Sequence, residues 1–159
     1  MASMQPPRPH HLIVMVNGIN GSVKDWRFAA GQIKSRFGDQ VLVLCSCRNA
    51  ATSTYDGVDV MGHRLAEEIK EVVNRSPGLK RISFIAHSLG GLIARYAIGQ
   101  LYSPCETDHF SAIERSDRAY DGKIIHLQPT NFITLATPHL GSRGNWQVIF
   151  LPFGILQHC

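Results

Sequence analysis

Residues 82–98 read ISFIAHSLGGLIARYAI, and this stretch decides the fold. Its first five residues form a short apolar run with β-branched and aromatic side chains, which favours a buried strand. Its last seven residues, 92–98, are apolar nearly all round and predict a helix buried at the centre of the fold. Ser88 lies between the two runs. The stretch therefore predicts a strand, a tight turn that carries Ser88, and a helix.

Small residues occupy the positions two before and two after Ser88, namely Ala86 and Gly90. A strand and a helix joined by so sharp a turn approach closely, so a large side chain at either position would collide with its neighbours. The strained turn lifts the serine hydroxyl clear of the sheet edge, and the first amides of the helix point to the same place. This pattern indicates a serine nucleophile, with an ordinary turn serine as the alternative.

Strand-like and helix-like segments alternate along the rest of the chain. Further strands are predicted at residues 12–16, 41–45 and 132–136. One amphipathic helix is predicted to place Trp26, Ala30, Ile33 and Phe37 on its apolar stripe, and another to span about residues 60–73. This alternation predicts an α/β fold, with a mostly parallel sheet covered by helices on both faces.

The chain is predicted to form a single domain over residues 11–159, after a flexible, proline-rich leader at residues 1–10. Residues 101–130 are polar and irregular, and are expected to be a functional insertion such as a lid, or partly disordered. Cys45 and Cys47 would point to the same side of a strand, as small half-buried side chains rather than as metal ligands or a disulfide.

Composition narrows the class of protein. The 159 residues are 44% hydrophobic and 18% charged, which is typical of a globular chain that buries a core without disulfides or metals. The net charge of +4 is scattered along the chain, which argues against nucleic acid as a partner. We find no signal peptide and no stretch of membrane-spanning length, so an intracellular, cytoplasmic location is expected.

Three segments together resemble one family. Residues 86–90, AHSLG, look like the nucleophile elbow of α/β-hydrolases with Ala86 in place of the first glycine. Residues 11–21, HLIVMVNGING, and residues 131–144, NFITLATPHLGSRG, resemble segments of the putative serine esterase family, which are lipase-like α/β-hydrolases of plants and other eukaryotes. The resemblance covers roughly residues 11–144.

The resemblance implies roles for several residues. Ser88 would attack the carbonyl of an ester, and the backbone N–H of Leu89 would be one donor to the oxyanion. An N–H near Gly18 or Ile19 would be the other, in a loop that reads Asn17-Gly18 where many hydrolases have His-Gly. The substrate would be a small-molecule or lipid ester, with peripheral contact at a membrane surface, and no metal or organic cofactor is implied.

The acid and the base of the family come after the serine, in the order serine, acid, histidine. No Asp or Glu follows Asp121, and we expect the later strands that carry the acid and the base to be missing from this sequence. We therefore expect a partial α/β-hydrolase fold without its C-terminal strands. His139 is a candidate surrogate base, or else a histidine that holds its own loop. The alternative function is a catalytically inactive form that binds acyl groups or proteins, and an exposed sheet edge would favour self-association.

Overall fold

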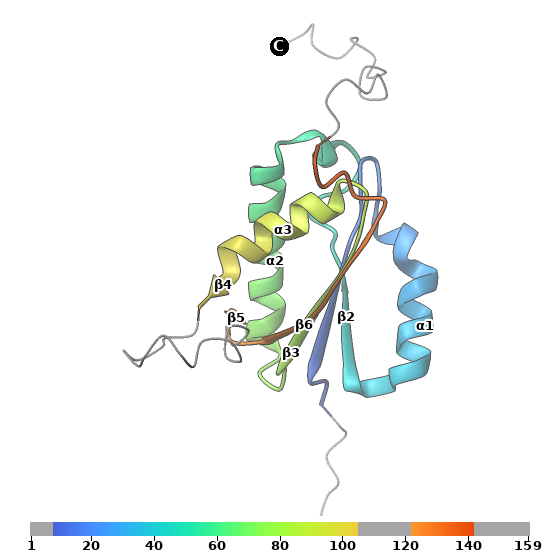
Figure 1. Ribbon diagram of the computed structural model, residues 1–159. Coiled ribbons are helices and arrows are strands. Elements are labelled where there is room, and N and C mark those ends of the chain that lie inside the picture. The colour runs from blue at the N-terminus through green and yellow to red at the C-terminus, as the bar shows by residue number, and fades with distance from the viewer. Residues whose placement is uncertain (1–7, 105–121, 142–159) are drawn as a thin grey trace, which may run out of the picture.

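The computed structural model describes residues 8–104 and 122–141, which form a parallel sheet with helices packed on it (Figure 1). The sheet has four strands in the order β2-β1-β3-β6. They are β1 (His11–Val16), β2 (Val41–Cys45), β3 (Arg81–His87) and β6 (Gln128–Leu135). All three neighbouring pairs are parallel, so the carboxyl ends of the strands lie along one edge of the sheet.

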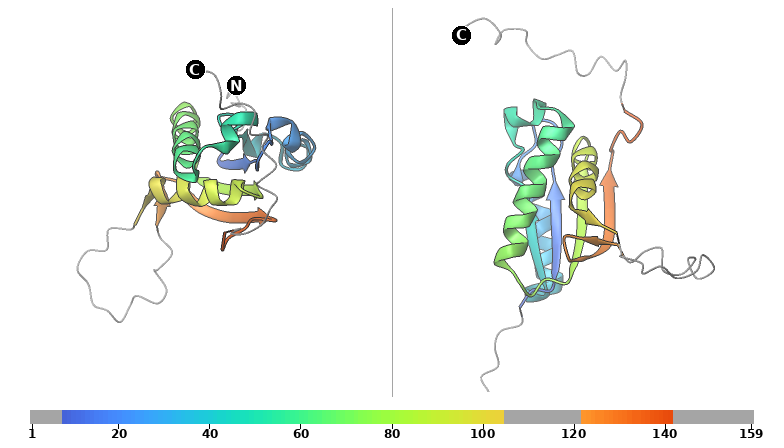
Figure 2. Two further views of the ribbon diagram at one scale, coloured as in Figure 1. Left: turned by 90° about the horizontal axis from the view of Figure 1, so that it is seen from above. Right: turned by 90° about the vertical axis from the view of Figure 1, so that its left-hand side faces the viewer.

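Helices cover both faces of the sheet (Figures 1 and 2). α1 (Arg27–Phe37) packs on one face, while α2 (Val58–Arg75) and α3 (Gly90–Leu101) pack on the other. The 3₁₀ turns are η1 (Val23–Trp26), η2 (Gly38–Gln40) and η3 (Ala51–Tyr55). The predicted α/β architecture is confirmed.

The continuous apolar run of β1 follows from its place between two layers of helix. Leu12, Val14 and Val16 face the core beneath α2 and α3, whereas Ile13 and Met15 face α1. All five side chains are at most 8% exposed, so neither face of the strand has a polar position. This is the pattern of a central strand in a parallel sheet.

The helices match their predicted stripes in part. α1 packs Ala29, Ala30 and Ile33 against the sheet, but Phe37, predicted to lie on the same stripe, is 46% exposed at the last turn. α1 ends there because Gly38 adopts a φ of +54°, which a helix does not continue through.

The prediction that α3 is buried all round is wrong. Its side chains at Ile93, Ala94 and Ala97 are buried against the sheet and α2, but Arg95 and Tyr96 are exposed. Tyr96 remains 40% exposed even though its side chain lies against Gly62 of α2.

The ends of the predicted insertion are more regular than expected. β4 (Tyr102–Ser103) pairs antiparallel with β5 (Lys123–Ile124), and β6 begins at Gln128 rather than at the predicted residue 132. The middle of the insertion, residues 105–121, lies outside the described residues, as do residues 142–159. The leader also stops short of residue 10, because His10 exchanges backbone hydrogen bonds with Gln40, Lys80 and Arg81.

β6 is an edge strand with an open apolar surface. Phe132, Ile133 and Leu135 are 42%, 47% and 48% exposed. β3 pairs with one side of β6, and no other strand among the described residues pairs with the opposite side. None of the described helices is long and apolar enough to cross a bilayer.

Candidate functional site

Ser88 occupies the two-residue turn between the end of β3 and the start of α3. Its φ is +53°, a left-handed conformation that is uncommon and costly for a residue with a side chain. Hydrogen bonds to β6 and to the loop after it hold this backbone in place. The Ser88 N–H donates to the carbonyl of Leu135 at 2.8 Å, and Thr137 Oγ1 donates to the carbonyl of Ser88 at 2.8 Å.

Two glycines allow the loop after β1 to contact this turn. A β-carbon on Gly90 would lie 2.4 Å from the carbonyl oxygen of Val16 and 2.6 Å from that of Asn17. A β-carbon on Gly18 would lie 2.8 Å from that of Ser88. Such distances are shorter than any real contact of this kind, so only glycine fits. The need for a small residue at Gly90 was predictable from the sequence, whereas the contact at Gly18 was not.

Three backbone amides near Ser88 are available as donors. The N–H groups of Gly18, Ile19 and Leu89 donate to no acceptor within residues 8–104 and 122–141. Leu89 follows Ser88 directly at the start of α3, and Ile19 belongs to the loop that contacts Ser88. These three amides are the set predicted to form an oxyanion hole.

A hollow of about 400 Å³ adjoins this end of the sheet. It is lined by Asn17, Ile19, Asn20, Gly21, Asp25, Trp26, His87 and Leu135. Asn20 in this lining also accepts a hydrogen bond from the hydroxyl of Tyr55 at 2.8 Å. The hollow therefore offers both apolar surface and polar groups beside the Ser88 turn.

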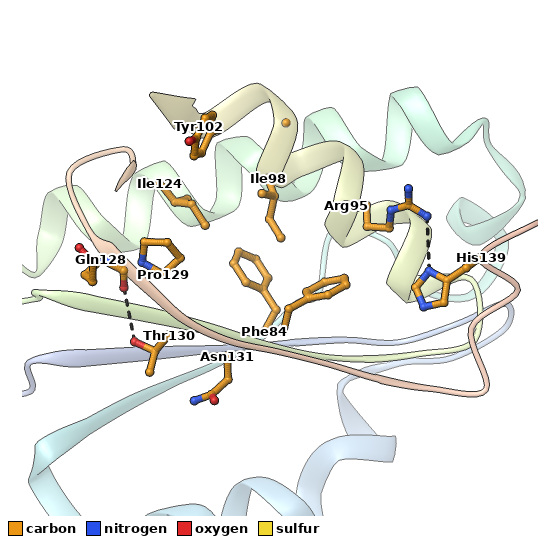
Figure 3. A pocket seen from close by; sticks show the side chains of 12 residues that line it. Phe84, Arg95, Ile98, Tyr102, Ile124, Gln128, Pro129, Thr130, Asn131 and His139 are labelled. Atoms are coloured by element: carbon orange, nitrogen blue, oxygen red, sulfur yellow. Dashed lines mark hydrogen bonds between the residues drawn. The ribbon is translucent and has the colours of Figure 1, made fainter. Parts of the chain in front are cut away.

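His139 lies on the other side of β6, in a separate hollow of about 770 Å³ (Figure 3). Its Nε2 is 3.1 Å from Thr134 Oγ1, and its Nδ1 is 3.4 Å from an Arg95 guanidinium nitrogen. In the part of the chain that the structure describes, no hydrogen bond joins His139 to Ser88. These contacts fit a histidine that holds its own loop, which is the alternative to a surrogate base.

A buried carboxylate lies against the segment just after β2, and it was not predicted from the sequence. Glu68 of α2 is only 5% exposed. It accepts hydrogen bonds from Ser46 Oγ at 2.7 Å, from the Cys47 N–H at 3.0 Å and from Cys47 Sγ at 3.2 Å. The bond from Cys47 Sγ raises the pKa of that thiol. The available signal was a glutamate three residues after Leu65, on the buried stripe of a helix.

Cys45 and Cys47 do not share a side of the sheet, contrary to prediction. Cys45 belongs to the core under α1, whereas Cys47 contacts Glu68 of α2. The reason is that β2 ends at Cys45, so the alternation of a strand does not extend to Cys47. Both are free thiols.

A parallel sheet covered by helices on both faces, with a strained serine at the turn after its third strand, defines an α/β-hydrolase fold. Two solved structures of Bacillus licheniformis lipase BlEst2 share it. The mature form aligns with a TM-score of 0.52 at 20% identity, over 89% of this chain and 48% of that one. The propeptide form also gives 0.52, at 22% identity, over 87% of this chain and 24% of that one.

The chain belongs to the family described as "Putative serine esterase (DUF676)", whose sequence profile matches residues 6–158. It is 30% identical to the Saccharomyces cerevisiae protein named "Putative lipase ROG1", over 95% of this chain and 21% of that protein. It is 29% identical to the Schizosaccharomyces pombe protein named "Putative lipase C4A8.10", over 84% of this chain and 16% of that protein. The chain therefore spans only about a fifth of the length of these relatives.

Proposed function

We propose that this protein is a serine hydrolase of carboxylic esters, of esterase or lipase type, with Ser88 as its nucleophile. The observation that carries the proposal is the strained backbone of Ser88, whose φ is +53° in the turn after β3. Such a backbone supports a nucleophile elbow, which would expose the serine oxygen above the carboxyl edge of the sheet. An ordinary turn serine has no need of such strain.

The proposed reaction has two steps. Ser88 Oγ attacks the carbonyl carbon of the ester while its proton passes to a general base, and the tetrahedral intermediate expels the alcohol, which takes that proton. Water then attacks the acyl-enzyme, releases the carboxylic acid and returns the proton to Ser88. The backbone N–H groups of Leu89 and of Ile19 or Gly18 would stabilise the oxyanion in both steps.

We propose that the acid and the base of this mechanism lie beyond residue 159, because the family order puts them after the serine and no Asp or Glu follows Asp121. His139 is the candidate base within the described chain. To act on Ser88 it would first have to leave Thr134 and Arg95, which lie 3.1 Å and 3.4 Å from its two ring nitrogens.

The proposed substrate is a small-molecule ester or a lipid ester. A lipid ester would be reached by peripheral contact with a lipid surface. The hollow beside Ser88 would take part of the acyl chain against Ile19, Trp26 and Leu135. Apolar lining with few polar groups is typical of sites for such ligands.

Labelling with a fluorophosphonate probe tests the proposal, because the probe reacts with a serine that a base activates. Ser88→Ala and His139→Ala variants are labelled beside the wild-type chain. Labelling that Ser88→Ala abolishes would support the nucleophile, and its loss in His139→Ala would identify the surrogate base. A folded chain that takes no label at Ser88 would contradict hydrolysis by this chain.

The open surface of β6 favours a second candidate, a non-catalytic form that binds acyl groups or protein partners. Ile133 and Leu135 expose nearly half of their apolar side chains beside an unpaired edge in the described part of the sheet. Such an edge promotes pairing with a second copy. Under this proposal, light scattering would detect dimers or larger species, and Ile133→Lys would reduce them. A monomeric wild-type chain would contradict self-association.

A further inference from the structure

We propose that Asn17 is a positioning residue that orients the backbone N–H of Ile19 as the second oxyanion donor, and that α2 holds Asn17 in place through Asn49. The inference rests on the proposed function of Ser88. It also chooses between the two donors that the sequence left open, Gly18 and Ile19.

The Asn17 side chain is buried and can face its neighbours in only one way. It is 3% exposed, and its Nδ2 donates to the carbonyl oxygens of Gly18 at 3.2 Å and of Asn49 at 2.9 Å. Both neighbours are acceptors, so the amide nitrogen must face them, because the reversed amide would place oxygen against oxygen. The side chain therefore acts as a double donor.

The double donor fixes the peptide between Gly18 and Ile19. The carbonyl of Gly18 accepts a second hydrogen bond, from the N–H of Gly21 at 3.0 Å. In a planar trans peptide the N–H points opposite to the carbonyl. The two donors to the Gly18 carbonyl therefore direct the Ile19 N–H away from the inside of the loop, and Ile19 lines the hollow beside Ser88.

The peptide between Asn17 and Gly18 is oriented differently from the one between Gly18 and Ile19. The carbonyl oxygen of Asn17 lies toward the start of α3, where a β-carbon on Gly90 would come within 2.6 Å of it. The N–H of Gly18 therefore points away from the start of α3 and from the Leu89 amide. This selects Ile19 over Gly18 as the partner of Leu89.

Asn49 connects the loop to α2. It is 1% exposed, and its Nδ2 donates to the backbone carbonyl of Met61 in α2 at 2.8 Å. The backbone carbonyl of Asn49 accepts the hydrogen bond from Asn17 Nδ2. The segment just before it is fixed to the same helix by Glu68. A buried polar network that begins on α2 thus sets the position of the Ile19 donor. Its Nδ2 groups are paired, whereas the Oδ1 atoms of Asn17 and Asn49 have no hydrogen-bond partner among the described residues, so the network acts through its donors alone.

Asn17→Asp tests the inference, because it keeps the shape of the side chain but replaces the double donor by an acceptor. Asn74→Asp is the matched control, since Asn74 is exposed on the last turns of α2. We expect Asn17→Asp to lower kcat on the order of tenfold with KM nearly unchanged, because the donor acts on the transition state. Asn74→Asp should change neither constant.

A second readout follows the donors directly by NMR with an alkyl boronic acid, which forms a tetrahedral adduct on an activated serine. In the wild-type chain both the Ile19 and Leu89 amide protons should shift, and in Ser88→Ala neither should. In Asn17→Asp the Leu89 shift should persist while the Ile19 shift is largely lost. Without any ligand, hydrogen exchange at the Gly21 amide should be faster in Asn17→Asp than in Asn74→Asp.

The outcomes separate the two claims. Equal kcat and equal Ile19 shifts in Asn17→Asp and the wild-type chain would overturn the positioning role while Ser88 chemistry stands. If neither turnover nor adduct depends on Ser88, the proposed function fails, and Gly21 exchange then decides the position of the loop. Unchanged exchange there would overturn the inference as well.

Discussion

Gly18 and Ser88 are in direct contact across two different loops of the protein. A β-carbon on Gly18 would lie 2.8 Å from the Ser88 β-carbon and 3.3 Å from its hydroxyl oxygen. The loop after β1 and the turn after β3 therefore form one unit, and the atoms proposed to act in catalysis are placed by packing between distant segments of sequence.

Gly18→Ala should disturb this unit because the new methyl group has no room. We expect a loss of about 1–3 kcal/mol in the free energy of unfolding, as for other overpacked sites. Ser88-dependent ester turnover should fall by more than that loss of folded protein accounts for, since the methyl group displaces the serine itself. Urea unfolding and steady-state kinetics measure the two effects.

Gly31→Ala is the control for that change. Nothing lies within 4 Å of the added β-carbon at Gly31, which is on α1. There alanine should raise the free energy of unfolding by about 0.5–1 kcal/mol, because it restricts the unfolded chain and favours helix. Equal effects of the two substitutions would show that the contact with Ser88 is not tight.

Within α3, Gly91 and Gly99 provide a second comparison in a single helix. A β-carbon on Gly91 would lie 2.2 Å from Thr137 Oγ1, the hydroxyl that donates to the Ser88 carbonyl, whereas nothing lies within 4 Å of one on Gly99. Gly91→Ala should lower the melting temperature and broaden or shift the Ser88 amide signal. Gly99→Ala should raise the melting temperature slightly, by helix propensity alone. The reverse order would contradict the role of Thr137.

Much of the fold was predictable because it follows from local pattern. The four parallel strands appear in the sequence as separate apolar runs, and the turn at Ser88 is marked by small residues on both sides. The predictions of burial failed where burial depends on contacts between elements that are distant in the sequence. Phe37 and Tyr96 continue apolar stretches of the sequence but are 46% and 40% exposed.

The site was predictable only in its local part. Ser88 and Leu89 belong to one motif, whereas the long-range contacts of Asn17, Asn49 and Glu68 span 12 to 32 positions of sequence. Each is a polar residue that looks like a loop or helix-surface residue when read alone. Their burial, at 3%, 1% and 5% exposure, becomes visible only when β1, β2 and α2 are packed together.

Glu68 should control the reactivity of Cys47. The Cys47 side chain is exposed, yet its hydrogen bond to the Glu68 carboxylate, followed by burial, raises the pKa of the thiol. A raised pKa means less thiolate at neutral pH and slower alkylation. Glu68→Gln removes the negative charge and should lower that pKa, so iodoacetamide should modify the Cys47 peptide faster, as followed by mass spectrometry.

Cys45 provides the internal reference in that experiment. Its thiol pKa is raised chiefly by burial under α1, and Glu68 does not contribute to that shift. The rate at Cys45 should therefore not change in Glu68→Gln. A parallel rise at both thiols would indicate general loosening of the fold rather than a local change of charge.

His11 should make the stability of the protein depend on pH below neutrality. Its Nε2 is 2.8 Å from Ser83 Oγ, and burial, followed by the charge of Arg81 and of His10, lowers its pKa below the ordinary value of about 6.5. The folded state therefore binds the proton less readily than the unfolded chain. His11 contributes its full stability above about pH 6.5, and this contribution is lost as the pH falls through the window between 6.5 and the lower pKa of the folded state.

His11→Gln retains a polar group beside Ser83 but does not titrate, so its free energy of unfolding should fall less steeply than that of the wild-type chain over this window. Urea unfolding of both proteins at a series of pH values measures the difference, and parallel curves would show that His11 does not titrate with folding.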